Sequence, residues 1–352
     1  MLRVLRPGSR RGRWIPGRAL GGFCAAALAA GLTCGVVSPA GAASASPGDL
    51  TPIANLPNEA AFQGTNGDLW VAGPDASGDQ FLGMAPRTNP SITALMKSST
   101  FEAAFQANTG DLWISGSAGT RDENLKMWPG TSPTIVGLAD LTQGYEIAFQ
   151  ASNGDLYLLG TLANGDQHLA MHAGTSPSIT YYGSTGYEVA YVGSNGDLWL
   201  AGTFANGDQH VAVMALTSPS IHIVGISSLY EVAFQGTNGD LWLQGSFATG
   251  DQHLAMKAGT SPAVTFTEFP SIGYEAAYQG TNGHLWLAGT AASGDTSDPM
   301  ADNPAIAFLL NGSYQAIVQV PPSGALFSSG SVAGGPQTGM FLMAGTSPSF
   351  AD

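Results

Sequence analysis

The chain has 352 residues, including 48 glycines and 21 prolines, and a formal net charge of −14. Glycine and proline at this density, with no stretch of sustained helical periodicity, exclude the helical repeat folds. The sequence contains no phosphate-binding loop, no H-E-x-x-H and no G-x-S-x-G, so it carries none of the common signatures of nucleotide hydrolases, zinc proteases or serine hydrolases.

Residues 1–45 have the layout of a secretory signal peptide. Six arginines come first, an apolar run over residues 19–37 follows, and small residues come next, so cleavage is expected near Ala42 or Ala45. A membrane anchor is the alternative, but the run is rich in alanine and glycine rather than leucine. We therefore predict a secreted, extracellular protein.

The chain that remains keeps five basic residues against all 25 acidic ones, a net charge of −20. Such an acidic surface repels phosphate backbones and anionic lipid headgroups, which argues against nucleic acid and membranes as partners. Both cysteines, Cys24 and Cys34, belong to the leader, so the mature chain forms no disulfide.

Residues 46–352 are predicted to form a single domain built from one repeated sequence. The fifth copy, residues 230–262, reads YEVAFQGTNGDLWLQGSFATGDQHLAMKAGTSP. The position of Asp240 recurs every 41–44 residues, in seven copies. These copies are marked by Asp68, Asp111, Asp155, Asp197, Asp240, His284 and Ala325.

Each copy contains four short apolar stretches separated by turn residues. Those of the fifth copy cover 231–235, 241–244 and 253–256, and the stretch 263–266 begins the next copy. Four strands in about 43 residues are the unit of a β-propeller blade. We therefore predict an all-β, seven-bladed β-propeller of four-stranded antiparallel blades. The β-trefoil, the alternative, needs units in multiples of three.

Three turns punctuate the fifth copy. Asn-Gly at 238–239 predicts a hairpin with a type I′ turn, in which both residues have positive φ. A second turn is predicted over 248–251, between the third and fourth strands, and a third over 258–262, before the next blade. The stretch before the first hairpin and the C-terminal stretch both resemble the innermost strand. One chain end is therefore expected to close the ring, and the sequence does not show which.

An aromatic residue follows the hairpin in all seven copies. These residues are Trp70, Trp113, Tyr157, Trp199, Trp242 and Trp286, with Phe327 in the last copy. An indole face can stack on the apolar face of a sugar, and a residue that recurs in every blade can equally be a packing element. Both interpretations stay open at this point.

The second candidate site is a Gly-Asp-Gln-His sequence in copies three to five. It comprises Asp166, Gln167 and His168, then Asp208, Gln209 and His210, then Asp251, Gln252 and His253. Aspartate beside glycine is explained by turn chemistry, but glutamine and histidine are not. We therefore predict that this turn binds a ligand. No metal is expected, because the histidines are 42 or 43 residues apart and no second ligand is evident nearby.

A glutamate begins the second strand of six copies and a glutamine ends it in five. In the fifth copy these are Glu231 and Gln235, which fall on one face of the strand. The glutamates either cap the N–H groups of a neighbouring turn or contact a ligand.

The string A-F-Q-x-x-x-G-x-L-W-x-x-G, followed by M-x-x-G-T-S-P-S-I, resembles repeats of secreted actinobacterial proteins. In blade length and hairpin pattern the chain looks like the tachylectin-type and PLL-type β-propeller lectins, over about residues 50–352. This resemblance implies that a small sugar, often fucose or N-acetylglucosamine, binds between adjacent blades at the aromatics and the Asp-Gln-His positions. The sixth and seventh copies depart most, with His284, Thr296 and Ala325.

We therefore hypothesise a secreted, non-enzymatic, monomeric protein that binds glycans through several similar sites and needs no cofactor. One alternative is an extracellular protein-interaction scaffold. Another is a glycoside hydrolase with one divergent site between the last and first blades. Catalysis needs one site unlike the others, and the copies are nearly alike.

Overall fold

The structure, a computed structural model, describes residues 58–351 with several short gaps. The residues left out within that range are 75, 96–99, 118, 139–143, 183–185, 225–227, 268–271, 310–312 and 331–334. The predicted signal peptide and its cleavage site lie outside the described residues. The described part of the chain contains no helix that could span a membrane.

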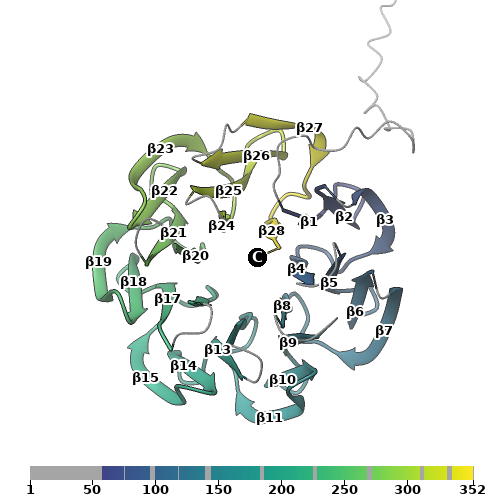
Figure 1. The fold of residues 1–352 in the computed structure, drawn as a ribbon, viewed down its shortest axis with the longest axis horizontal. Coiled ribbons are helices and arrows are strands. Elements are labelled where there is room, and N and C mark those ends of the chain that lie inside the picture. The colour runs from purple at the N-terminus through teal and green to yellow at the C-terminus, as the bar shows by residue number, and fades with distance from the viewer. Residues whose placement is uncertain are drawn as a thin grey trace, which may run out of the picture. The chain divides into compact units, whose positions relative to one another are not determined.

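Seven four-stranded antiparallel sheets form the described domain, and Figure 1 shows them arranged around a common centre. The predicted seven-bladed β-propeller is therefore confirmed. Within a blade the chain runs from the innermost strand outward, as in the order β16-β17-β18-β19 of blade 5.

The strands are assigned to blades as follows. Blade 1 consists of β28 (Ser349–Phe350), β1 (Ala60–Gln63), β2 (Asp68–Ala72) and β3 (Ser77–Gly83). Blade 2 consists of β4 (Ser91–Leu95), β5 (Thr100–Gln106), β6 (Asp111–Gly116) and β7 (Gly119–Lys126). Blade 3 consists of β8 (Thr134–Gly137), β9 (Tyr145–Gln150), β10 (Asp155–Gly160) and β11 (Asn164–Ala170). Blade 4 consists of β12 (Ser178–Tyr182), β13 (Gly186–Val192), β14 (Asp197–Gly202) and β15 (Gly207–Ala212).

The remaining blades repeat the pattern. Blade 5 consists of β16 (Ser220–Ile223), β17 (Tyr230–Gln235), β18 (Asp240–Gly245) and β19 (Thr249–Ala255). Blade 6 consists of β20 (Ala263–Thr267), β21 (Gly273–Gln279), β22 (His284–Gly289) and β23 (Ser293–Pro299). Blade 7 consists of β24 (Ala305–Leu309), β25 (Ser313–Val320), β26 (Ala325–Gly330) and β27 (Gly335–Phe341).

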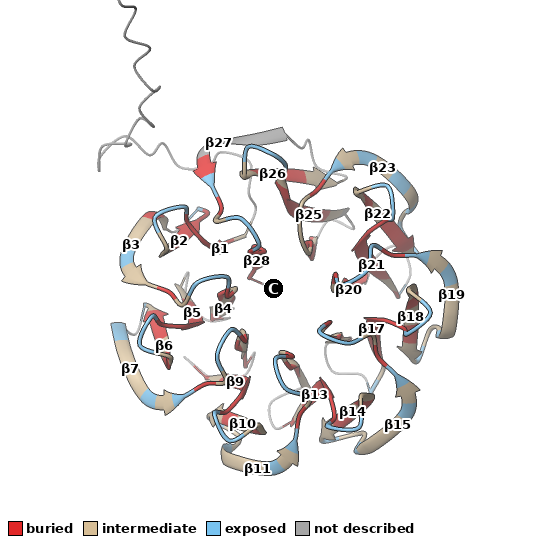
Figure 2. Cartoon of the chain, turned by 180° about the vertical axis from the view of Figure 1, so that it is seen from behind, coloured by how far each residue is buried: buried red, intermediate tan, exposed pale blue. Residues whose placement is uncertain are grey.

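The second strand of each blade is buried on both faces because each blade packs between two others. Successive side chains of a strand point to opposite faces. In β1, Ala60 and Phe62 therefore join a core cluster shared with blade 7, whereas Ala61 joins one shared with blade 2. The third strand packs inward too, and the fourth is the half-exposed rim that Figure 2 shows in tan and pale blue. This arrangement explains why the apolar stretches show no polar face.

The C-terminal strand closes the ring. Strand β28 pairs antiparallel with β1, with Phe350 opposite Ala60 and Ser349 opposite Ala61. The innermost strand of blade 1 thus comes from the far end of the chain, and the edge of β1 that faces the centre is paired. An unpaired strand edge would be a template for association with another chain.

A circle of hydrogen bonds links the loops that lead from one blade into the next. At seven equivalent positions the backbone N–H donates to the side-chain oxygen of the equivalent residue in the following blade, over 2.7–3.1 Å. The positions are Asn89, Ser132, Ser176, Ser218, Ser261, Asn303 and Ser347, after which Ser347 donates back to Asn89. The serine of the repeated Gly-Thr-Ser-Pro sequence therefore ties neighbouring blades together.

Two of the predicted turns differ from the structure. In the hairpin at Gly236–Asp240, the N–H of Gly239 donates to the carbonyl of Gly236, and only Gly239 has positive φ, at 89°. This is a turn followed by a left-handed glycine in a bulge, not the predicted type I′ turn, which needs two positive φ values. The turn predicted over 248–251 was also wrong, because β19 already begins at Thr249.

Candidate ligand-binding grooves between blades

The Asp-Gln-His sequence lies in a bulge of the outermost strand. In blade 5, Asp251 pairs with Trp242 and Ala255 with Asp240, so three residues of β19 oppose a single residue of β18. The bulge gives His253 a left-handed backbone, with a φ of 56°. Equivalent residues share this conformation whatever their side chain: Phe81, Asn124, His168, His210 and Ser297.

The aspartate and glutamine of this sequence are held by hydrogen bonds inside the bulge. Asp251 Oδ1 accepts from the backbone N–H of His253 at 2.7 Å, and Gln252 Nε2 donates to the carbonyl of Gly250 at 2.9 Å. Blades 3 and 4 repeat both bonds, through Asp166 and Gln167 and through Asp208 and Gln209. The imidazole rings of the three histidines, by contrast, are 85% exposed.

The hairpin asparagine links the aromatic residue and the two aspartates of its blade through hydrogen bonds. The sequence pattern had indicated only its place in a turn. Asn238 Oδ1 accepts from Trp242 Nε1 at 3.0 Å and from the N–H of Asp240 at 3.2 Å. Its amide nitrogen donates to Asp240 Oδ2 at 3.2 Å and to Asp251 Oδ2 at 2.7 Å. The signal that could have found it was the constant spacing of asparagine, aspartate and tryptophan in the repeat.

The post-hairpin aromatics pack against the neighbouring strand of their own blade. Trp242 lies 6.3 Å from the ring of Phe234 on the neighbouring strand, and Trp70, Trp199 and Trp286 share its hydrogen bond to the asparagine. In blade 2, Thr109 replaces the asparagine, and Trp113 Nε1 has no hydrogen-bond partner among the described residues. The packing interpretation is therefore confirmed, and a ligand role for the same rings stays a prediction.

Each aromatic also packs against the core cluster that its blade shares with the preceding blade. The apolar residue after the bulged position, on the outermost strand of the preceding blade, packs against the same cluster. The pairs are Leu82 with Trp113, Leu125 with Tyr157, Leu169 with Trp199, Val211 with Trp242, and Leu254 with Trp286. Trp70 packs in the same way against the core shared with blade 7.

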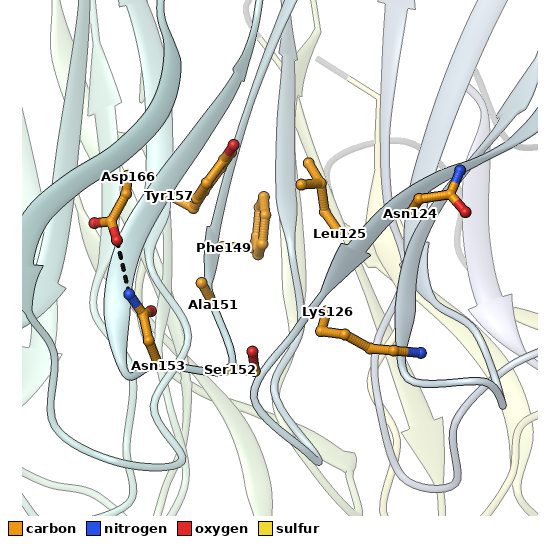
Figure 3. Close-up of a pocket in the computed structure, with 9 residues that line it drawn as sticks. All are labelled: Asn124, Leu125, Lys126, Phe149, Ala151, Ser152, Asn153, Tyr157 and Asp166. Carbon is orange, nitrogen blue, oxygen red and sulfur yellow. Dashed lines mark hydrogen bonds between the residues drawn. The ribbon is translucent and has the colours of Figure 1, made fainter.

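The groove between blades 2 and 3 has a volume of about 290 Å³. Figure 3 shows Tyr157 and Leu125 on opposite sides of Phe149, with Asn124 and Lys126 beyond. Tyrosine here replaces the larger tryptophan of most other blades, which leaves more space. The groove between blades 1 and 2 encloses about 160 Å³ and includes Phe81 and Trp113.

Each of the two pockets combines a predicted aromatic with the residue at the histidine position of the preceding blade. Phe81 and Asn124, at the histidine position, line the two pockets with the aromatic of the following blade. By the repeat, His168 belongs with Trp199, His210 with Trp242 and His253 with Trp286. Within one blade, each tryptophan instead pairs across the sheet with the aspartate. Of the predicted Asp-Gln-His residues, only Asp166 lines either of these two pockets, beside Tyr157 of the same blade.

Acidic groups on the rim differ in their titration. Hydrogen bonding from the backbone of His168 lowers the pKa of Asp166 below its ordinary value. Burial, with the nearby charge of Asp79, raises the pKa of Asp68.

The expectation that no second metal ligand lies near the histidines was wrong. In blades 3, 4 and 5 two aspartates of the same blade approach each histidine, with ligand atoms within 4.8 Å of one another.

The glutamates at the start of the second strand cap backbone N–H groups, as one of the two interpretations predicted. Glu231 Oε2 accepts from the N–H groups of Phe247 and Ala248, at 3.0 and 3.3 Å. Glu146, Glu188 and Glu275 make equivalent bonds. Gln235 likewise bonds backbone groups of the hairpin and of the interblade loop. These side chains are fully buried and hold the blade together.

No family model matches the sequence, and no curated protein is significantly similar to it. Solved structures are similar in fold. The BP39L lectin from Burkholderia pseudomallei aligns with a TM-score of 0.62 and 14% identity, over 83% of this chain and 97% of that chain. AofleA from Arthrobotrys oligospora aligns with a TM-score of 0.54 and 11% identity, over 76% of this chain and 91% of that chain.

Proposed function

We propose that the protein is a secreted, non-enzymatic lectin that binds glycans in several similar grooves between its blades. The observation that carries this proposal is the pocket between blades 2 and 3, in which the ring of Tyr157 lies beside apolar residues and the polar side chains of Asn124 and Asp166. Sugars bind to such surfaces by stacking their apolar face on an aromatic ring while polar groups meet their hydroxyls. The likeness of fold to a lectin supports the same conclusion.

Several weak sites on one ring suit a multivalent glycan. A single open groove buries little of a sugar, so its affinity is low. Linked sites can raise the apparent affinity by about 10²–10⁴-fold when the target presents several sugars at a matching spacing. A monomer of this protein would therefore act on polysaccharides or clustered surface glycans rather than on free monosaccharides.

The absence of catalysis is part of the proposal. The grooves are near-copies, and the buried glutamates that could have served as acid catalysts are engaged by backbone N–H groups. The predicted leader supports secretion, and the strongly acidic surface disfavours nucleic acid and anionic membranes as partners.

A glycan array with competition by simple sugars tests this function. The buffer contains a metal chelator, so that binding reports the grooves alone. We expect retention on a defined set of glycans and release by the matching monosaccharide. The proposal fails if the protein binds no glycan even at millimolar concentration.

Histidine variants test which residues form the site. His168→Ala, His210→Ala and His253→Ala together should weaken glycan binding by about tenfold or more, because avidity multiplies the loss at each site. The melting temperature should change little, since these rings are 85% exposed. Thr237→Ala, an exposed change on the hairpin, serves as the control. Wild-type binding by the triple variant would show that the histidines are not part of the groove site.

A further inference from the structure

Phe81 combines two features that are unfavourable in the protein without a ligand. Its side chain is 72% exposed, more than any other large apolar side chain among the described residues. Its backbone is left-handed, with a φ of 56°, a conformation that is strained for a bulky residue. The equivalent residues of blades 2 to 5 are an asparagine and three histidines, which are polar. Strain of this kind is concentrated at ligand sites, and contact with a ligand would remove the apolar ring from water.

The ring of Phe81 belongs to the pocket between blades 1 and 2, which also includes Trp113. Phe81 comes from β3 of blade 1 and Trp113 from β6 of blade 2, so the two rings reach the pocket from the two blades that flank it. The volume of about 160 Å³ is below the roughly 300–1,000 Å³ of pockets for drug-sized ligands, which suits a single small ring. None of the residues that line this pocket is charged.

The hairpin of blade 2 explains why this pocket is open. In blade 5, a Cβ on Gly236 would lie 2.3 Å from Trp242 Nε1, so the edge of the indole occupies that space. The same holds, at 2.4 Å, for Gly64, Gly193 and Gly280. Blade 2 has Ala107 at the equivalent position, and its Cβ excludes the ring of Trp113 from the place that the other indoles occupy.

A second change in the same hairpin releases the indole N–H. Asn238 accepts a hydrogen bond from Trp242 Nε1 in blade 5. Thr109 stands at this position in blade 2, and Trp113 Nε1 has no hydrogen-bond partner among the described residues. The ring of Trp113 is tilted by 45° to that of Phe105, against 33° in the equivalent pair of blade 5. No hydrogen bond to the hairpin therefore fixes this ring, which can turn to meet a ligand.

The pocket between blades 2 and 3 supports this explanation, because blade 3 also has an alanine at this hairpin position. Ala151 lines that pocket as Ala107 lines the pocket between blades 1 and 2. The aromatic of blade 3 is Tyr157, whose smaller ring has no indole edge. The replacement of glycine by alanine thus accompanies an open pocket on each side of blade 2.

An aromatic ring from each of two blades favours a sugar that is apolar on both faces. In a pyranose whose ring substituents are all equatorial, C–H groups cover both faces, and each face can stack on an aromatic ring. An axial hydroxyl makes one face polar, and its burial against a ring leaves it without a hydrogen bond. Asn108, which also lines the pocket, supplies an amide for equatorial hydroxyls. The uncharged lining and the acidic chain disfavour an anionic sugar.

We propose that the pocket between blades 1 and 2 binds one uncharged sugar ring of the glucose configuration between Phe81 and Trp113. The inference rests on the proposed function and adds a ligand class for this pocket. The bound sugar covers the exposed ring of Phe81 on one face, and Trp113 turns to stack on the other face.

Saturation-transfer NMR with methyl β-D-glucopyranoside and methyl β-D-galactopyranoside tests the proposal. The two sugars differ only at C4, where the hydroxyl is equatorial in the glucoside and axial in the galactoside. We expect the glucoside to bind about tenfold more tightly, because the axial hydroxyl loses its hydrogen bonds against a ring. Equal binding of the two sugars, or binding of neither, would overturn this site. Glycan binding on the array in that case would leave the proposed function standing.

Phe81→Asn is the matched variant, because Asn124 occupies the equivalent position of blade 2 with the same backbone, at a φ of 55°. Asparagine tolerates the left-handed region, so the variant should melt no lower than wild type while it loses the preference for the glucoside. Leu216→Asn is the control. Leu216 is 70% exposed, has a φ of 64° and lies outside the pocket, so this change should leave the preference intact. A preference that persists in Phe81→Asn would contradict the assignment.

A second variant tests the explanation for the open pocket. Ala107→Gly combined with Thr109→Asn gives blade 2 the glycine and asparagine of blade 5, which should restore the hydrogen bond of the Trp113 N–H. We expect weaker binding of the glucoside, because the indole returns to the space beside the glycine. Unchanged glucoside binding by this variant would show that the hairpin does not control the pocket.

Discussion

Glu231 combines full burial with hydrogen bonds to only one of its two carboxylate oxygens. Oε2 accepts from two backbone N–H groups, and Oε1 has no hydrogen-bond partner among the described residues. Burial raises the pKa of this carboxyl from 4.5 to about 7, against the lowering effect of the two backbone donors. The pKa of Glu146 and that of Glu275 are raised to about 7 for the same reason.

This raised pKa predicts a specific dependence of stability on pH. The pKa is higher in the folded state, so the contribution of Glu231 to stability is fully present below about 4.5 and is lost as the pH rises through about 7. We expect the melting temperature to fall between about pH 5 and pH 8, and to fall less in Glu231→Gln. Gln315 occupies the equivalent position of blade 7, so the amide is accepted there.

Melting followed by circular dichroism across this pH range measures the effect. The lowered pKa values of Asp166 and Asp295 act with the opposite sign, since their contribution is lost only as the pH falls below the ordinary range of an aspartate. An equally steep fall in Glu231→Gln and in wild type would contradict the assignment to this carboxyl.

Among strands and turns, the hairpin between the second and third strands of each blade depends on one glycine. Gly239 has a φ of 89°, and a Cβ at this position would meet no atom within 4 Å. The requirement for glycine is therefore one of backbone conformation and not of space. Asparagine tolerates this region better than alanine does.

Gly239→Ala should therefore lower the free energy of unfolding by about 1 kcal/mol, because alanine is strained at positive φ. Gly239→Asn should cost less, which makes it the matched control. Urea denaturation of both variants checks the order. An alanine variant as stable as the asparagine variant would show that the left-handed turn is not the source of the strain.

The bulge of the outermost strand shows why the candidate site was only partly predictable. Asp251 and Gln252 were identified as ligand residues because glutamine and histidine have no role in a turn. The structure gives both side chains a role in the bulge, which leaves the ring of His253 as the exposed group of the sequence. A bulge depends on pairing with the neighbouring strand, and a periodic pattern in one strand does not record it.

The whole ring depends on contacts between residues at opposite ends of the chain. Strand β28 pairs with β1, and Phe350 is buried in the core shared by blades 7 and 1. Ser347 also completes the circle of interblade hydrogen bonds. Closure removes the exposed edges that an open sheet would carry.

Removal of residues 349–352 should therefore lower the melting temperature by several degrees and promote self-association through β1. Phe350→Ala keeps the strand but removes its ring, and should cost about 3 kcal/mol, as for other buried aromatic truncations. Light scattering and thermal melting of the two variants separate the edge effect from the packing effect. A truncated chain that stays monomeric and melts like wild type would show that β28 is dispensable for closure.

Much of the architecture follows from local patterns. The number of blades, their four strands and the position of the hairpins follow from a sequence that repeats every 41–44 residues, because each copy must bury the same apolar stretches. The capping role of Glu231 was also foreseen as one alternative, since a carboxylate that recurs in every blade needs a recurrent partner.

Other features became visible only in three dimensions. The sequence contains two equally suitable closing stretches, and only the pairing of β28 with β1 decides between them. It places Leu169 and Trp199 in different repeats, and only the packing of blade against blade brings them to one core cluster. It separates the three histidines by 42 or 43 residues, whereas the bulge places two aspartates of its own blade beside each one. A repeat determines what each blade contains, while contacts across strands and between blades determine which side chains meet.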